Sequence, residues 1–150
     1  MAELESTRVA LDTCVFIYYI EEHPHYIPLV EPIFAAAFAR EHEIVTSALT
    51  LLEVLVVPLR AGNVALAKRF EAVLTRSRGL RMIDVTRDQL RAAALLRARH
   101  GVRTPDALQL AAAVAGRCAT FITNDRALPQ IPGLRVIQLG DYVRAEGRAT

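Results

Sequence analysis

Short apolar runs bounded by polar residues alternate along the chain with longer segments whose apolar residues recur at helical spacing. The short runs predict buried strands over residues 8–12, 43–46, 80–85, 118–122 and 134–139. The longer segments predict helices over residues 15–20, 28–40, 48–60, 64–78, 87–100 and 104–115, with a short one from residue 141. Strands that alternate with helices in this way favour a parallel sheet with helices on both faces.

Several of the predicted helices carry residues that mark their ends. Ser47 can cap the helix that starts at residue 48, and Thr104 can cap the helix in which Pro105 takes the first position. Gly101 closes the helix before it. We expect a single domain over residues 1–150, with a frayed tail after about residue 144.

The composition is that of a globular domain with a core of its own. The chain has 150 residues, of which 53% are hydrophobic and 23% charged, which excludes a disordered tail, a collagen and a disulfide-stapled miniprotein. No apolar run is long enough to span a membrane, and no basic region followed by an apolar run opens the chain, so we expect a cytoplasmic protein. Cys14 and Cys118 match no zinc-binding spacing, and we expect two reduced thiols, with a long-range disulfide left open.

The charges are unevenly distributed along the chain, although the net charge is only +2. Residues 1–59 carry a net charge of −7, residues 60–103 carry +8 and residues 104–150 carry +1. This asymmetry indicates a polyanionic partner. Solvated helix faces in an arginine-rich composition explain it equally well.

Four acidic residues are expected to meet at one edge of the predicted sheet. Asp12 ends the first strand and Asp125 follows the fourth, so both lie at the carboxyl edge, where parallel sheets bind ligands. Crossover helices begin near that edge, which places Asp106 there in the first turn of its helix. Glu53 lies about 8 Å into its own helix at about 1.5 Å per residue. All four carboxylates can therefore converge.

Glu53 is unusual because its helix is apolar nearly all round, which is typical of a buried helix. A carboxylate buried there needs a positive partner, either a metal ion or an arginine from elsewhere in the fold. The other three acids also have ordinary structural interpretations. Asp106 can complement its helix dipole, Asp125 can stabilise a turn, and Asp12 can cap the following helix.

Crowded carboxylates raise one another's pKa values unless a cation lies between them. Oxygen ligands without a His or Cys cluster suit Mg²⁺ or Mn²⁺, and such ions support hydrolysis of a phosphodiester. The four histidines are scattered and indicate a solvated surface rather than a metal site. Tyr18, Tyr19 and Tyr26 favour helix packing over contact with RNA bases.

Four segments together resemble the PIN domain, in particular the VapC-type toxins of bacterial toxin–antitoxin pairs. They are Val9-Ala-Leu-Asp-Thr13, Val45-Thr-Ser-Ala-Leu-Thr-Leu-Leu-Glu53, Arg103-Thr-Pro-Asp-Ala-Leu-Gln-Leu-Ala111 and Phe121-Ile-Thr-Asn-Asp-Arg-Ala-Leu128. The resemblance implies a three-layer α/β/α sandwich with a five-stranded parallel sheet. It also implies a Mg²⁺-dependent endoribonuclease, a homodimer formed through helices near the start of the chain, and an antitoxin that occupies the acidic groove.

The resemblance assigns roles to individual residues. It makes Asp12 and Asp106 the principal metal ligands, while Glu53 and Asp125 complete the cluster and help to orient the attacking water. Thr13, Ser47 and Thr123 take positions from which they can hydrogen-bond the ligands. Some relatives carry a further acid shortly after the Thr-Asn-Asp position, where this chain has Ala127 and Leu128.

Three other functions are open at this point. A catalytically silent RNA- or protein-binding module and a housekeeping RNA-processing nuclease are both compatible with the same fold. A haloacid-dehalogenase-type phosphatase also places an Asp after the first strand, but it needs a second acid where this chain has Cys14. It also needs a lysine near the later strands, whereas Lys68 is the chain's one lysine.

Overall fold

A computed structural model describes residues 7–143 of the chain. The strands are β1 (Arg8–Leu11), β2 (Glu43–Ser47), β3 (Leu80–Ile83), β4 (Thr120–Thr123) and β5 (Arg135–Gln138). The helices are α2 (Thr13–Ile20), α3 (Ile27–Phe38), α4 (Leu49–Arg60), α5 (Val64–Arg76), α6 (Arg87–His100) and α7 (Thr104–Ala115), and a helical turn over residues 139–143 follows β5. The predicted order of strands and helices is confirmed, with shifts of a few residues at the ends. The tail predicted to fray lies outside the described residues.

The five strands form one parallel sheet in the order β3-β2-β1-β4-β5. Ala10 of β1 pairs with Val45 of β2 on one side and with Phe121 of β4 on the other. The chain therefore builds outward from β1 to β3, then returns across the sheet and continues through β4 to β5. Because parallel crossovers are right-handed, this reversal of direction moves the connecting helices to the opposite face.

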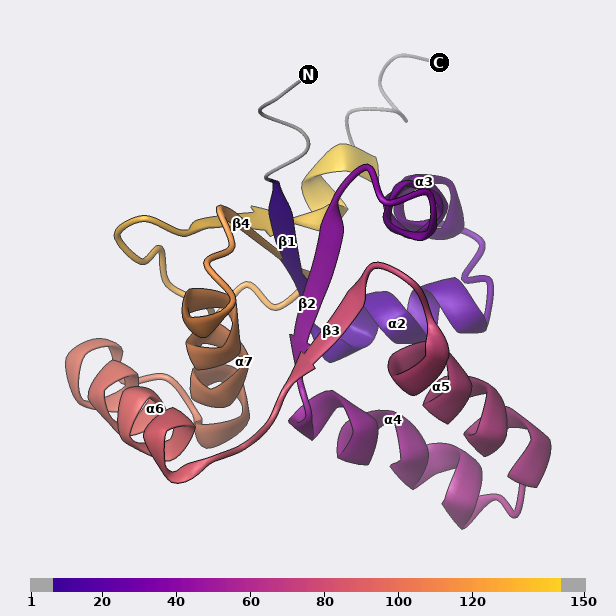
Figure 1. Ribbon diagram of the computed structural model, residues 1–150, viewed down its shortest axis with the longest axis horizontal. Helices are drawn as coiled ribbons and strands as arrows, with labels where there is room; N and C mark the ends of the chain where they lie inside the picture. Colours follow the sequence, from indigo (N-terminus) through magenta and orange to yellow (C-terminus); the bar gives the residue numbers. More distant parts are fainter. Residues whose placement is uncertain (1–6, 144–150) are drawn as a thin grey trace.

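The two faces of the sheet are covered by different helices, as Figure 1 shows. Ala10, Val45 and Phe121 point to the face covered by α6 and α7, where they share one core cluster. Their neighbours Leu11 and Ile44 point to the other face, where they pack against residues of α2 to α5. This alternation along each strand produces the predicted three-layer α/β/α sandwich.

Helix α4 differs from the prediction that it is buried on all sides. It buries Thr50, Val54 and Pro58, which lie one helical turn apart on a single face. Leu52 and Leu59 are each 61% exposed on the opposite face. Figure 1 shows why, since α4 packs beneath α5 and runs away from the strands, so that no layer covers its outer side within the described residues.

The two cysteines lie on opposite faces of the sheet, and both are free. Cys118 belongs to the core cluster under α6 and α7, whereas Cys14 packs against the cluster under α2 to α5. Burial raises the pKa of the Cys14 thiol to about 12 and that of Cys118 to about 11. Both cysteines are free thiols, as predicted, and they do not form the long-range disulfide that the sequence left open.

The capping predictions had different outcomes. Ser47 Oγ accepts a hydrogen bond from the amide of Leu49 at 3.1 Å, so it satisfies a free N–H of α4 as predicted, although the capping position itself belongs to Ala48. The predicted cap at Thr104 is wrong by one residue, because Arg103 takes the capping position of α7.

In residues 7–143, no helix is both long and apolar enough to cross a bilayer.

Candidate active site

The candidate site lies where the strand order reverses, between the carboxyl ends of β1 and β4. The connections from these two neighbouring strands lead to opposite sides of the sheet, which opens a crevice at this point in parallel α/β folds. Asp12 follows β1 directly, and Asp125 follows β4 after one intervening residue. The sheet topology therefore brings these two acids, 113 positions apart in the sequence, to one edge.

Asp12 combines two structural roles at this edge. Its Oδ1 accepts a hydrogen bond from the amide of Thr13 at 2.8 Å, so that it caps α2. Its Oδ2 accepts a hydrogen bond from Thr123 Oγ1 at 2.7 Å, which ties β1 to β4. The capping interpretation of Asp12 is thus correct, and it fixes the orientation of a carboxylate that faces the crevice.

The carboxyl of Asp12 has a raised pKa. Burial is the largest cause, and the negative charges of Asp106 and Glu53 raise the pKa further. The hydrogen bonds from Thr123 and Thr13 act in the opposite direction without cancelling the rise. Asp12 is therefore a partly desolvated acid whose ionised form lacks a cationic partner among the described residues.

Asp106 lies in the first turn of α7, where its side chain is only 12% exposed. Burial raises its pKa, and the charge of Asp125 adds to the rise. The guanidinium of Arg103 lowers the pKa, with its Nε 3.4 Å from Asp106 Oδ2. Glu53 raises it by a smaller amount. The pKa of Asp106 is therefore influenced by the charges of two other acids and one arginine, besides burial.

Glu53 is half-buried and is held by a hydroxyl rather than by a cation. Its Oε1 accepts a hydrogen bond from Thr13 Oγ1 at 2.7 Å. No lysine or arginine in residues 7–143 forms an ion pair with it, so the alternative of a tertiary arginine partner is not what the structure has. Because Thr13 also donates its amide to Asp12, one residue orients two of the predicted ligands.

Asp125 forms a turn and also faces Asp106. Its Oδ1 accepts a hydrogen bond from the amide of Ala127 at 2.9 Å, as expected of a turn-forming aspartate. Its Oδ2 lies 3.6 Å from the NH2 of Arg103. Its backbone carbonyl accepts a hydrogen bond from Gln138 Nε2 at 2.9 Å, which anchors the turn to β5.

The four carboxylates thus form a chain of mutual electrostatic influence from Glu53 through Asp12 and Asp106 to Asp125. Within residues 7–143, no three His, Cys, Asp or Glu side chains are close enough together to form a complete metal site as they stand. The four acids nevertheless fit a hard divalent cation, because carboxylate oxygens are the ligands that such ions prefer. The pKa values of Asp12 and Asp106 are raised, and the cation paired with the group, Arg103, is largely exposed. Asp12 and Asp106, the more buried acids, are the ligands that such an ion would stabilise most.

The sequence profile of the PIN domain matches residues 9–134. This chain belongs to the PIN domain family. The matched range contains all four acids. No curated protein sequence matches the chain.

Three solved structures share the fold of this PIN domain. One is VapBC2 from Rickettsia felis bound to a DNA fragment from its promoter, with a TM-score of 0.68, 20% identity, and coverage of 88% of this chain and 98% of that one. A toxin–antitoxin complex from Klebsiella pneumoniae has a TM-score of 0.66 at 22% identity, covering 87% and 97%. DNA-bound VapBC from Salmonella typhimurium has a TM-score of 0.61 at 22% identity, covering 89% and 98%.

Beneath the acids, this PIN domain has a polar network that the sequence did not lead us to assign. The side chain of Gln109 donates hydrogen bonds to Thr50 Oγ1 at 2.8 Å and to Thr13 Oγ1 at 3.3 Å. Thr50 in turn bonds Thr46 at 2.7 Å. A glutamine three residues after Asp106, within an otherwise apolar helical run, was the feature that could have revealed it.

The three residues expected to hydrogen-bond the ligands are placed differently from one another. Thr13 bonds Glu53, and Thr123 bonds Asp12. The hydroxyl of Ser47 binds a backbone amide of α4 instead, and its own amide donates to Gln109 Oε1 at 3.3 Å. Ser47 therefore supports the polar network under the acids and has no direct hydrogen bond to a carboxylate in the described part of the chain.

Asn124 connects the site edge to the tyrosines of α2 and the loop before α3. Its Nδ2 donates to Tyr26 OH at 2.9 Å and to Tyr18 OH at 3.3 Å. The two tyrosine rings stack with their centroids 4.4 Å apart. The tyrosines pack against one another and hold Asn124, which agrees with the expected packing role.

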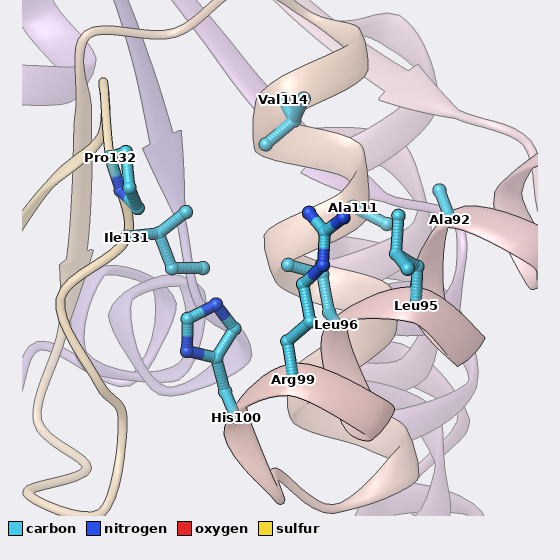
Figure 2. A pocket seen from close by; sticks show the side chains of 9 residues that line it. All are labelled: Ala92, Leu95, Leu96, Arg99, His100, Ala111, Val114, Ile131 and Pro132. Carbon is cyan, nitrogen blue, oxygen red and sulfur yellow. The ribbon is translucent and has the colours of Figure 1, made fainter.

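The PIN domain also has an apolar pocket of about 440 Å³ between α6, α7 and the segment before β5, shown in Figure 2. Leu96 and Ile131 line it, and Arg99 and His100 lie at its side. No acidic residue lines it. The pocket is therefore chemically unsuited to a metal ion, and the acids at the carboxyl edge remain the candidate active site.

Proposed function

We propose that this PIN domain is a Mg²⁺-dependent endoribonuclease and the toxin of a toxin–antitoxin pair. The observation that carries the proposal is the electrostatic grouping of Asp12, Asp106, Glu53 and Asp125 at the strand-order reversal. Carboxylates crowded in this way are costly without a divalent counter-ion, with Mn²⁺ expected to substitute for Mg²⁺.

The proposed chemistry is hydrolysis of an RNA phosphodiester bond. A bound divalent ion lowers the pKa of a coordinated water and neutralises charge on the leaving oxygen. Asp12 and Asp106 would hold the metal, while Glu53 and Asp125 complete the cluster and help to orient the attacking water. Thr13 and Thr123 fix the carboxylate oxygens by hydrogen bonds of 2.7 Å each, which limits the reorganisation needed for catalysis.

The proposed biological role rests on the fold shared with VapBC complexes. We infer that a cognate antitoxin binds this chain and blocks the acidic crevice, and that the chain forms a homodimer. The exposed apolar side of α4, with Leu52, Val56 and Leu59, is available surface for such contacts. The substrate is cytoplasmic RNA, and the excess of arginine over residues 60–103 supports attraction of that polyanion.

A cleavage assay with purified protein and single-stranded RNA tests the chemistry. We expect cleavage with Mg²⁺ that EDTA abolishes and that Asp12→Asn lowers by at least about 100-fold. Asp88→Asn is a matched control, because Asp88 is an exposed acid that pairs with Arg91 on α6. Cleavage that persists through both chelation and the Asp12 substitution would overturn the metal mechanism.

Expression in a bacterial host separates a toxin from the other candidates. A toxin arrests growth, the arrest disappears with Asp12→Asn, and a protein encoded beside it relieves the arrest. A housekeeping RNA-processing nuclease would cleave RNA without arresting growth. A silent binding module would bind RNA or protein with no turnover, and its binding would survive loss of the acids.

A further inference from the structure

Arg103 lies between two of the predicted metal ligands. Its Nε is 3.4 Å from Asp106 Oδ2, and its NH2 is 3.6 Å from Asp125 Oδ2. One guanidinium therefore bridges the acid of α7 and the acid that follows β4. The two oxygens it faces belong to the carboxylates that would coordinate a divalent ion in the proposed function.

Hydrogen bonds from Arg97 hold the backbone on both sides of Arg103, whereas the side chain of Arg103 is largely exposed. Arg97 of α6 donates from its Nε to the carbonyl of Val102 at 3.0 Å and from its NH1 to Thr104 Oγ1 at 3.0 Å. These bonds hold the residues on both sides of Arg103. The side chain of Arg103 is 76% exposed and pairs only through distances above 3.3 Å. Asp106 and Asp125 are 12% and 30% exposed, so the exposed guanidinium reaches two largely buried carboxylates at distances longer than those of a close ion pair.

Arg103 is also the one cation that pairs with any of the four acids within residues 7–143. The other ion pairs of this region join Arg8 to Glu43, Arg91 to Asp88 and Arg126 to Asp141, and none of them includes one of the four acids. The guanidinium lowers the pKa of Asp106 against the effects of burial and of Asp125. It therefore offsets part of the negative charge that the fold concentrates at this edge.

We propose that Arg103 is an internal counter-ion that holds Asp106 and Asp125 when no metal is bound and is displaced by the entering divalent cation. The inference rests on the proposed function for its metal. A guanidinium and a divalent ion that share one carboxylate repel each other, so each weakens the binding of the other even though the carboxylate has lone pairs for both. Arg103 thus acts as a positioning residue that tunes the metal affinity of the site and keeps the metal-free fold from accumulating unpaired charge.

Calorimetric titration with Mn²⁺ alone tests the competition without any cleavage assay. We expect Arg103→Gln to bind Mn²⁺ roughly three- to tenfold more tightly than the natural sequence, since the metal no longer has to displace a cation. Arg103→Lys should lie between the two. Arg91→Gln is the matched control, because Arg91 is also an exposed arginine paired with an aspartate at the i,i+3 spacing, but on α6 and away from the four acids.

NMR of the arginine side chains gives a second readout. The Nε–Hε resonance of Arg103 is identified by its absence from the spectrum of Arg103→Lys. We expect it to shift on titration with diamagnetic Mg²⁺, while the corresponding resonance of Arg91 stays in place. Thermal melting in EDTA and with Mn²⁺ checks that each variant folds, which the exposure of the side chain leads us to expect.

The outcomes separate this inference from the proposed function. If the natural sequence binds Mn²⁺ and Arg103→Gln binds it equally or more weakly, the counter-ion role is wrong and the nuclease proposal stands. An Arg103 resonance that ignores Mg²⁺ in a protein that binds the ion overturns it as well. If neither protein binds Mn²⁺ at all, both proposals fall. Tighter binding by Arg103→Gln together with an unchanged Arg91→Gln supports the inference.

Discussion

Asp12 illustrates how a single residue carries both a structural benefit and a structural cost. Its two oxygens accept hydrogen bonds from Thr13 and Thr123, which link α2 and β4 to the end of β1. The same carboxyl is buried near Asp106 and Glu53, and the net result is a raised pKa. A group whose folded-state pKa is raised binds more protons in the folded state, so its ionisation costs stability.

This cost predicts the pH dependence of the metal-free protein. As the pH rises from the ordinary carboxyl value near 3.8 through the raised pKa of Asp12, the folded state gives up a proton that the unfolded state has already lost, and stability falls. Asp12→Asn should therefore melt about 2–4 °C higher than the natural sequence in EDTA at pH 7, a difference of about 1 kcal/mol at this chain length. Its advantage should vanish at about pH 4.

Thermal melts between pH 4 and 7.5 in EDTA measure this effect. Asp88→Asn serves as the control, because the Asp88 carboxylate is 91% exposed and is not one of the four grouped acids. An Asp12→Asn variant that is less stable than the natural sequence at pH 7 would mean that the hydrogen bonds from Thr13 and Thr123 outweigh the repulsion.

Thr13 gives a second prediction at this scale, since its hydroxyl is the hydrogen-bond donor that holds Glu53. Thr13→Val keeps the shape of the side chain and the amide that donates to the capping Asp12, but it removes this hydroxyl donor. We expect a loss of roughly 10- to 100-fold in Mn²⁺ affinity or RNA cleavage, because residues that orient ligands have effects of that size. Thr75→Val, which removes an exposed hydroxyl bonded within α5, should change neither quantity.

What the sequence reveals about individual residues depends on whether their partners are local. The i,i+3 spacing of Arg103 and Asp106 is visible in the sequence and indicates an ion pair. The second partner, Asp125, is 22 positions away and meets Arg103 only because α7 and the end of β4 share an edge. For the same reason, the sequence shows that no Lys or Arg lies three or four residues from Glu53, whereas its hydrogen bond with Thr13 depends on the folded chain.

Among the elements, the alternation of strand faces was the most predictable feature. Residues such as Ala10 and Leu11 are both apolar, because each face of a parallel sheet is covered by helices, and this pattern correctly indicated buried strands. The burial of α4 was not predictable from its composition. Hydrophobicity shows that a helix can be buried, whereas the number of layers around it decides whether Leu52 and Val57 are covered.

The turn between α5 and β3 yields a prediction at the element scale. Gly79 has φ +72°, and a Cβ there would overlap the carbonyl oxygen of Ala37 at the end of α3. The carbonyl of Gly79 also accepts a hydrogen bond from the amide of Ile44 at 2.7 Å. Gly79→Ala should lower the stability by about 2–4 kcal/mol, because left-handed strain and a backbone clash act together.

Chemical denaturation measures this loss, and Gly133→Ala provides the matched control. Gly133 also has a positive φ of +81°, but a Cβ there would meet no atom within 4 Å. Gly133→Ala should therefore cost only about 1 kcal/mol from backbone strain. Equal losses in the two variants would show that the contact between α3 and the turn at Gly79 does not constrain the fold.

At the scale of the whole molecule, the exposed apolar side of α4 is a surface feature separate from the four acids. The acids gather at the carboxyl edge of β1 and β4, while the outer side of α4 exposes apolar residues in a molecule whose described helices cannot span a membrane. A contiguous apolar surface of this kind indicates contact with another protein. Within the proposed function, a second copy of the chain and the antitoxin compete as candidates for that surface.

The homodimer is a prediction that light scattering after size-exclusion chromatography can check. We expect the natural chain to have the mass of a dimer and the double variant Leu52→Glu/Leu59→Glu to have the mass of a monomer, because two buried carboxylates would oppose the contact. Both side chains are more than 60% exposed in the single chain, so the variant should fold and melt nearly as the natural chain does. Leu95→Glu, a change at a 50% exposed position on α6, should remain a dimer. A dimeric double variant would exclude α4 as the interface, whereas a monomeric natural chain would remove the homodimer and leave the outer side of α4 to the antitoxin.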